Sequence, residues 1–504
     1  MLKKAIALCL SMAVFACTNQ GPKEEQPLQK PRTIVTTDGE IDDVDSFIRM
    51  LLYANEFDIQ GLVISSSMWH YKGDGKGTLF TSEMEMTKKM YGAIPSLRWA
   101  GTEWMFPLID AYEEVFPKLS QHAEGFPTAA DLRSLVKVGN IDFEGEMEKD
   151  TEGSDFIKAS LLDSDTRPLY LQVWGGTNTI ARALKSIEDQ YKGSPEWESI
   201  YKRVCDKAIL YAILDQDATY RKYIAPNWPD MKVYYNANQF WCFAYPWKRA
   251  VPEEEHYLFE GDFMGNEIIN GHGPLLKQYY SYGDGQKQAG DDEHIHGDLS
   301  KIKEGQWGNF GQFDFISEGD SPAYLHLINV GLDNLTHPEW GGWGGRLVQS
   351  EEQANRWEDG EQAKDYNPFT EKMDPTYPQI RWVKAIQEDF AARADWCISN
   401  YAEANHPPVV KALGPKKVDG KKGTDVLLKI ESSDPDGDQT HTAFWIYKEV
   451  GSYTGDAQVD FEDNTCTVHL PNAGDEGQLH VIAEVSDDGV HPMTRYQRFV
   501  ISVK

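Results

Sequence analysis

Between residues 32 and 400 the chain alternates short apolar runs with longer segments whose apolar residues recur at helical spacing. The short runs are typical of buried strands, and the longer segments predict amphipathic helices. Strands that alternate with helices indicate an α/β fold, a mostly parallel sheet flanked by helices. We expect strands at 33–37, 57–66, 167–174, 208–214 and 232–235, and helices from residue 42 and at 80–91, 108–115, 155–162, 180–184 and 381–401.

The pattern changes at Asn405. From there to Lys504, short strands of alternating apolar and polar residues are separated by turn residues. A segment of this kind predicts a β-sandwich of the immunoglobulin or fibronectin type. The strands are expected at 426–431, 442–447, 466–470, 479–485 and 497–503, so the predicted domains are 32–400 and 405–504.

The beginning of the chain has the pattern of an export signal. Lys3 and Lys4 precede a short apolar run that ends in V-F-A-C, with Cys17 at the cleavage position. This ending resembles the bacterial lipobox, in which the cysteine is lipidated; an ordinary cleaved signal peptide is the alternative. Residues 18–31 are polar and proline-containing, which predicts a flexible tether. We expect a lipoprotein of the cell envelope, anchored in the outer membrane at its periplasmic side or at the cell surface.

Charge and cysteine content narrow the function classes. The formal net charge is −31, and such a chain is repelled by nucleic acid and by anionic membranes. We therefore expect no nucleic-acid partner, and contact with a membrane only through the lipid. The four cysteines after Cys17 show no C-x-x-C spacing, which argues against zinc. The 15 tryptophans include candidates for stacking on sugar rings, although most tryptophans are core residues.

The most informative stretch follows the first predicted strand. Five acidic residues crowd the turn and the start of the next helix: Asp38, Glu40, Asp42, Asp43 and Asp45. One or two of them could cap the helix, where the dipole is worth about 0.3–1 kcal/mol each. The whole set repels itself unless a cation or a proton lies among the carboxylates. Because ligands bind at the carboxyl ends of strands in open α/β sheets, we predict a metal or sugar site here.

Other strand ends and glycine-rich loops supply candidate substrate contacts. Each has a plainer alternative: a satisfied structural histidine, a solvated turn or a core tryptophan. The candidates are Asp42, Trp69, Asn178, Asp215, Asp217, His272, Glu318 and Trp343.

Three motifs resemble those of nucleoside hydrolases. T-T-D-G-E-I-D-D at 36–43 resembles the family's aspartate-rich signature, D-x-D-P-G-x-D-D, and G-G-T-N-T at 175–179 resembles its second motif. E-G-D-S-P at 318–322 falls where that family has its last calcium-ligating aspartate. Together with the predicted sandwich, the chain resembles a bacterial cellulose-binding family with a nucleoside-hydrolase-like domain.

The resemblance implies a calcium site. Asp38, Asp43, Asp320 and the backbone carbonyl of Thr177 would be its ligands, completed by water or substrate hydroxyls. Asp38 would also act as general base on a calcium-bound water, and Asp42 would hold sugar hydroxyls. The expected activity is calcium-dependent hydrolysis of glycosyl or N-glycosyl bonds in plant-type carbohydrate or glycosides. The alternative is a non-catalytic protein that binds cellulose or another polysaccharide.

The signature departs from the family pattern in three places. Thr36 replaces the first aspartate, Gly39-Glu40 replaces Pro-Gly, and Gly319 stands where some nucleoside hydrolases carry a histidine that protonates the leaving base. The leaving-group acid is therefore not identified by the motif. Candidates to replace it are Glu40, Asp217, His272 and Glu318.

Overall fold

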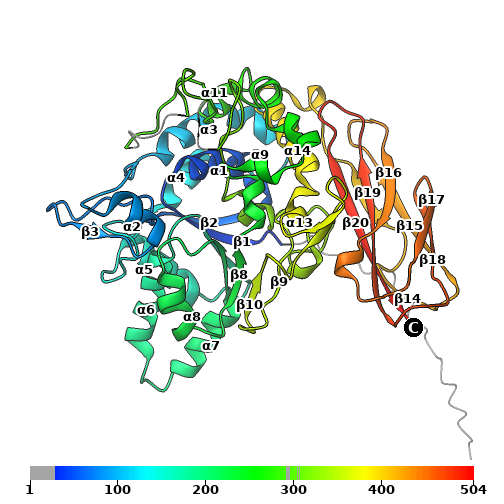
Figure 1. Ribbon diagram of the computed structural model, residues 1–504, viewed down its shortest axis with the longest axis horizontal. Helices are drawn as coiled ribbons and strands as arrows, with labels where there is room; N and C mark the ends of the chain where they lie inside the picture. The colour runs from blue at the N-terminus through cyan, green and yellow to red at the C-terminus, as the bar shows by residue number, and fades with distance from the viewer. Residues whose placement is uncertain (1–28, 291–295, 304, 306) are drawn as a thin grey trace, which may run out of the picture. The chain divides into compact units, whose positions relative to one another are not determined.

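The computed structural model describes residues 29–290, 296–303, 305 and 307–504. Its central element is an eight-stranded sheet in the order β5-β2-β1-β6-β7-β8-β10-β9 (Figure 1). Neighbouring strands are parallel except β9 and β10, so the predicted α/β fold is confirmed. The strands are β1 (Arg32–Thr37), β2 (Asp58–Ile64), β5 (Val136–Val138), β6 (Leu169–Val173), β7 (Ala208–Ile213), β8 (Lys232–Asn236), β9 (Val348–Gln349) and β10 (Arg356–Glu358).

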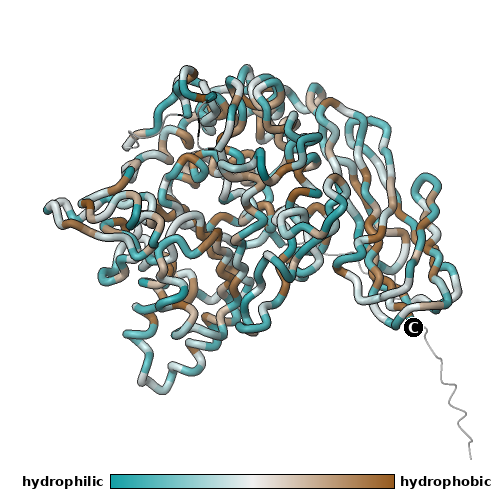
Figure 2. The backbone as a smooth tube through the Cα atoms, in the orientation of Figure 1, coloured by the Kyte–Doolittle hydropathy of each residue, from teal (hydrophilic) through white to brown (hydrophobic). Residues whose placement is uncertain are grey.

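Helices cover both faces of this sheet. Successive strand residues point to opposite faces, so Ile34 and Val35 of β1 belong to two different hydrophobic clusters. The cluster of Ile34 includes α5 (Glu152–Leu162), α6 (Asn178–Tyr191) and α7 (Trp197–Lys207). The cluster of Val35 includes α1 (Ile41–Leu52), α3 (Met105–His122), α4 (Ala129–Leu135) and α14 (Val383–Trp396). Figure 2 shows hydrophobic residues concentrated in the interior of the sheet region, and hydrophilic residues more frequent in the outer loops.

The strand order reverses beside β1. After β1 the chain adds β2 and β5 on one side, and then returns to place β6 on the other side. Thr36 lies opposite Val173 in the β1–β6 register, so the loops that follow these two strands start at the same level of the sheet. Such a reversal leaves a crevice at the carboxyl ends of the two strands, which is the usual ligand position in this class of sheet.

One predicted helix is partly wrong. The segment 80–91 divides into β3 (Phe80–Thr81), which pairs with β4 (Ala93–Ile94), and α2 (Glu85–Tyr91). The reason is local: the Ser82 side chain accepts a hydrogen bond of 2.9 Å from the amide of Met84, whose backbone is extended. Side-chain bonds of this kind compete with helical ones.

Short elements fill the region after β8, where the sequence pattern weakens. Most connect through turns and 3₁₀ or π segments. They are α8 (Ala225–Asn227), α9 (Trp247–Ala250), α10 (Gly261–Phe263), α11 (Gly273–Leu276), α12 (Ser321–Leu325), α13 (Tyr377–Ile380), β11 (Asp365–Asn367) and β12 (Lys372–Asp374).

The C-terminal part is the predicted sandwich. Two four-stranded sheets, ordered β13-β15-β18-β17 and β14-β20-β19-β16, enclose a core of their own. The five predicted strands are present, and β13, β14 and β17 join them. The strands are β13 (Val409–Ala412), β14 (Lys417–Gly420), β15 (Asp425–Ser433), β16 (His441–Ile446), β17 (Gln458–Glu462), β18 (Thr465–His469), β19 (Gly477–Ser486) and β20 (Thr494–Val503).

The sandwich is joined to the α/β part by buried polar contacts. The amide of Tyr496 donates to the carbonyl of Val330 at 2.8 Å, and the Tyr447 hydroxyl donates to Asp365 at 2.6 Å. Residues 31–504 accordingly form one compact unit. The predicted signal peptide, Cys17 and most of the tether lie outside the described residues. No helix in the described part of the chain has the length and apolar character needed to cross a membrane.

Candidate functional site

The acidic stretch lies at the reversal of strand order. Only Asp38, Gly39 and Glu40 separate the end of β1 from the start of α1. Gly39 has a φ of +78°, and a Cβ on it would lie 2.8 Å from Nε1 of Trp104. Both restrictions require glycine at this position. The tight turn therefore keeps the first turn of α1 close to the strand end.

Three carboxylates meet beside this turn. Asp42 and Asp43 belong to the first turn of α1, and Asp320 immediately precedes α12. Each offers one carboxylate oxygen, and these oxygens all lie within 4.8 Å of one another. Asp43 and Asp320 are each 1% exposed, whereas Asp42 is partly exposed. The fold thus brings together two acidic segments that are far apart in the sequence.

Asp38 begins the turn that follows β1 and lies against the turn that follows β6. It is 2% exposed, and a Cβ on Gly175 would come within 2.9 Å of its Cγ. Among the described residues, neither carboxylate oxygen of Asp38 or of Asp320 has a hydrogen-bond partner. Burying a carboxylate without a partner is unfavourable. A cation among these oxygens would compensate that cost, so the donor set suits a hard metal ion.

Asp43 is held by the strand end itself. The Thr37 hydroxyl and the Asp38 amide both donate to its Oδ1, the amide at 3.3 Å. Oδ1 is therefore fixed toward the β1 turn. Asp43 is thus oriented before any ligand binds.

Crowding changes the acidity of the cluster. Burial and then the Asp38 charge raise the pKa of Asp42 to about 7. Burial, followed by neighbouring carboxylates, raises the pKa of Asp43 and of Asp320 well above the ordinary value. Shared negative charge of this kind favours binding of either protons or a cation.

A second group of side chains lies against Glu40. The Tyr245 hydroxyl donates to Oε1 of Glu40 at 2.9 Å, and Nε2 of His70 lies 4.0 Å from Oε2. Burial, followed by the charges of Asp42 and Asp38, raises the pKa of Glu40 well above its ordinary value. The sequence reasoning missed Tyr245 and Trp104, because both reach the turn from segments with no recognisable motif.

The second glycine-rich turn holds a helix cap. Asp217 accepts hydrogen bonds from the Thr177 hydroxyl at 3.1 Å and from the Asn178 amide at 2.9 Å, at the start of α6. The Thr177 carbonyl accepts the amide of Ala181 at 2.9 Å and keeps one further lone pair. The Asn178 side-chain amide donates to three neighbours, among them Ser66. Asp217 and Asn178 thus act chiefly in holding this turn together.

Three other predicted contacts have structural partners. Asp215 forms an ion pair of 2.9 Å with Arg221. His272 lies 3.2 Å from Asp395. Glu318 is 0% exposed and pairs with a buried arginine. These contacts do not place the three side chains among the Asp42–Asp43–Asp320 carboxylates.

The two predicted tryptophans differ in exposure. Trp343 is 0% exposed, so it does not present the free ring face that sugar stacking requires. Trp69 is partly exposed, and its ring centroid lies 5.9 Å from the guanidinium carbon of Arg98. Of the two, only Trp69 has ring surface available to a ligand.

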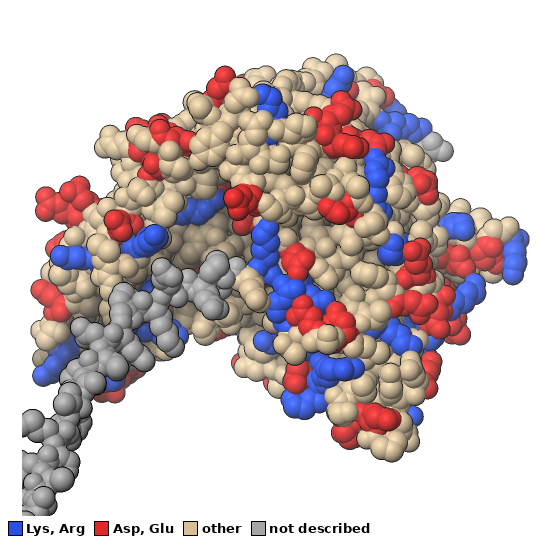
Figure 3. Space-filling model, turned by 180° about the vertical axis from the view of Figure 1, so that it is seen from behind, with Lys and Arg blue, Asp and Glu red and all other residues tan. Residues whose placement is uncertain are grey.

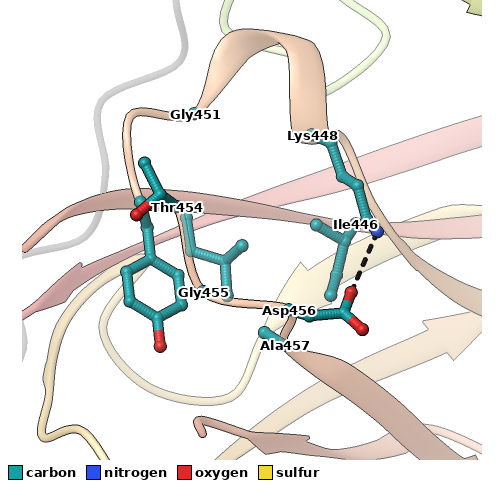
Figure 4. Close-up of a pocket in the computed structure, with 9 residues that line it drawn as sticks. Ile446, Lys448, Gly451, Thr454, Gly455, Asp456 and Ala457 are labelled. Atoms are coloured by element: carbon teal, nitrogen blue, oxygen red, sulfur yellow. Dashed lines mark hydrogen bonds and ion pairs between the residues drawn. The ribbon is translucent and has the colours of Figure 1, made fainter. Parts of the chain in front are cut away.

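Outside this site, a pocket of about 170 Å³ opens on the sandwich (Figure 4). An ion pair of 3.2 Å between Lys448 and Asp456 lies at its edge. The Tyr453 hydroxyl donates to the carbonyl of Ala473, so its polar end is already engaged. None of the lining residues belongs to the segments that carry the acidic cluster. The chemistry therefore points to the strand ends of the α/β sheet and not to this pocket.

Positive and negative side chains are mixed on the surface of the molecule seen in Figure 3. On the face shown in Figure 3, Lys and Arg are interspersed with Asp and Glu and form no continuous basic surface. The net charge of −31 remains the basis for expecting no nucleic-acid partner.

Comparison with known proteins gives one extensive match. Residues 32–347 match the family model described as cellulose-binding Sde182, nucleoside hydrolase-like domain. Residues 426–503 match the C-terminal domain model of cellulose-binding protein Sde0182. No curated protein matches the chain.

One solved structure resembles this chain over nearly its whole length. A nucleoside hydrolase-related protein from Saccharophagus degradans, described as associated with carbohydrate metabolism, is 26% identical, with a TM-score of 0.68. The similarity covers 94% of this chain and 100% of that one. A plant nucleoside hydrolase is 10% identical over 65% of this chain and 87% of its own, with a TM-score of 0.29, and supports no inference about this site.

Proposed function

The chain belongs to the Sde182 family of cellulose-binding proteins with a nucleoside hydrolase-like domain, and on that basis we propose that it is a calcium-dependent hydrolase of glycosyl or N-glycosyl bonds. The substrate class would be plant-type carbohydrate or glycosides. The observation that supports this proposal is that two buried carboxylates, Asp38 and Asp320, have no hydrogen-bond partners among the described residues, while Asp320 lies beside Asp42 and Asp43. A protein that only held polysaccharide would have little use for this arrangement.

Four groups are proposed to hold the ion: Asp38, Asp43, Asp320 and the Thr177 carbonyl. Calcium takes six to eight oxygen ligands, so water and sugar hydroxyls would complete the set. When bound, the ion supplies positive charge that lowers the pKa of a nearby water and orients substrate hydroxyls.

We assign proton transfer, substrate binding and charge stabilisation to different carboxylates. Asp38, at the end of β1, would accept a proton from the attacking water. Asp42, which is partly exposed, would accept hydrogen bonds from sugar hydroxyls. The surrounding carboxylates stabilise the positive charge that develops on the sugar ring in an oxocarbenium-like transition state.

For the leaving-group role we propose Glu40, the candidate that lies in the acidic turn itself. Asp217 is used in the cap of α6, His272 pairs with Asp395, and Glu318 pairs with an arginine. Glu40 lies in the turn itself, with the Tyr245 hydroxyl on its Oε1. Glu40→Gln is therefore the variant that tests this role, with Tyr245→Phe as its neighbour control.

A screen of product release tests the activity. Nucleosides and plant oligosaccharides are incubated with the protein in calcium and in chelator, and free sugar is measured. We expect calcium-dependent turnover that Asp38→Asn abolishes while the fold is kept. Binding to cellulose that survives Asp38→Asn, without turnover of any substrate, would instead establish the non-catalytic alternative.

The proposed location is the cell envelope, through lipidation of Cys17. A labelled fatty acid should be incorporated into the native chain and not into a Cys17→Ala variant. Equal incorporation of the label into both proteins would contradict lipidation at Cys17.

A further inference from the structure

A buried arginine connects α1, which carries Asp42 and Asp43, with the turn that carries Asp320. Arg49 lies in α1 and is 0% exposed, and its Nε is 2.7 Å from Oε2 of Glu318, which is also 0% exposed. α1 carries Asp42 and Asp43, and Glu318 comes two residues before Asp320. The ion pair therefore connects the helix with the turn that supplies the third carboxylate.

Arg49 is itself fixed by α14. Its Nη2 donates to Oε1 of Gln387 at 2.7 Å, and its guanidinium carbon lies 3.9 Å from the Phe390 ring centroid. Three separate segments thus meet on one guanidinium group. A planar cation with several donors suits such a junction better than an ammonium would.

Glu318 in turn holds the turn before α12. It accepts hydrogen bonds from the Tyr279 hydroxyl and, at 2.7 Å, from the Ser321 hydroxyl. Its carbonyl accepts the Ser321 amide at 3.0 Å, and its own amide donates to the carbonyl of Phe243 at 2.6 Å. Asp320 lies between Glu318 and Ser321, so these bonds hold the backbone on both sides of it.

We propose that the Arg49–Glu318 ion pair is a positioning pair that fixes Asp320 against Asp42 and Asp43. This inference rests on the proposed function, because the cluster is taken to be the cation site. Burying an ion pair costs desolvation free energy, and an apolar pair is often as stable. The pair is thus explained better by placement of the carboxylates than by stability. Residues behind metal ligands commonly have this role.

The test compares two buried ion pairs. Glu318→Gln and Arg49→Met disrupt the proposed pair. Asp389→Asn and Arg393→Met disrupt a control pair that is also buried, 3.0 Å long and contained within α14. Arg393 also donates to the carbonyl of Leu52, the last residue of α1, and to the side chain of Asn55. Calcium affinity is measured by calorimetry, and hydrogen exchange is measured for peptides that cover 318–325. Ser321→Ala is a milder variant, which removes one hydrogen bond to Glu318 and leaves the ion pair intact.

We expect Glu318→Gln and Arg49→Met to weaken calcium binding by about 10- to 100-fold, the range typical of residues behind metal ligands. Hydrogen exchange at 318–325 should also increase more in these two variants than in control variants that lose the same amount of Tm. Unchanged exchange at 318–325, or calcium affinity that falls equally in the control variants, would overturn the proposal. If the native protein binds no calcium, the proposed cation site fails, and the exchange measurement still decides whether the pair positions Asp320.

Discussion

Asp38 and Gly175 lie so close that a Cβ on the glycine would come within 2.9 Å of the aspartate Cγ. The backbone of the β6 turn therefore forms one wall of the Asp38 position. Since Asp38 follows β1 and Gly175 follows β6, this contact spans the reversal of strand order. The site depends on two neighbouring strands that end at the same level of the sheet.

Gly175→Ala should displace Asp38. The added methyl group forces the carboxylate out of its position, so we expect a loss of calcium affinity together with a small loss of stability. Calorimetry with calcium and thermal unfolding in chelator measure the two effects. In an Asp38→Ala background, Gly175→Ala should change calcium binding little; a further large loss there would show that the methyl group acts on something other than Asp38.

Removing the Asp320 carboxylate should raise thermal stability without calcium and reduce the stabilisation that calcium provides. In chelator, Asp320→Asn relieves repulsion among buried carboxylates, so we expect a higher Tm than that of the native chain. With calcium at 100 times its Kd, the native free energy of unfolding should rise by about 2.7 kcal/mol, and the variant should gain less.

Asp438→Asn is the matched control, because Asp438 belongs to the other acidic group found in the described part of the chain, on the sandwich. It should leave both Tm values unchanged. If the Tm of the native chain is the same in calcium and in chelator, the proposed calcium site is contradicted.

The interface with the sandwich should weaken in acid. Burial raises the pKa of Asp389, but the charges of Arg495 and Arg393 outweigh burial and hold that pKa below its ordinary value. A carboxyl group with a lower pKa in the folded state contributes stability above its unfolded pKa, about 3.9. This contribution should be lost as the pH falls through the pKa of the folded state.

Urea unfolding measured between about pH 6 and pH 3 tests this expectation. The native chain should lose stability more steeply than Asp389→Asn over that range. Identical slopes would show that Asp389 does not contribute to the acid sensitivity.

The two tryptophans should respond differently to truncation. Trp343→Ala leaves a cavity in the core, so we expect a loss of about 3–5 kcal/mol in the free energy of unfolding. Trp69→Ala removes a partly exposed ring and should cost far less stability while it weakens binding of a carbohydrate substrate. Denaturant unfolding and KM on the substrate found by the screen separate the two. Equal loss of stability in both variants would contradict the assignment.

The elements that carry the acidic turn could be predicted from the sequence, whereas the contacts within the cluster depend on the tertiary structure. The β-branched run at 33–37 and the helical spacing from residue 42 sufficed to predict a strand, a turn and a helix, because both periodicities are local. The sandwich was predicted for the same reason, although β13, β14 and β17 were missed. In β17 only Val459 is partly buried, and the other residues are exposed, so the strand has little apolar signal.

Local sequence patterns were sufficient for the fold class, the acidic turn and the family resemblance, since each depends on residues close together in the chain. Which of the candidate residues meet depends on how distant segments pack. The tertiary structure placed Asp320 beside Asp42 and Asp43, assigned Glu318 to Arg49, and buried Trp343. Contacts of this kind arise from the packing of distant segments, and no local pattern of apolar and polar residues records that packing.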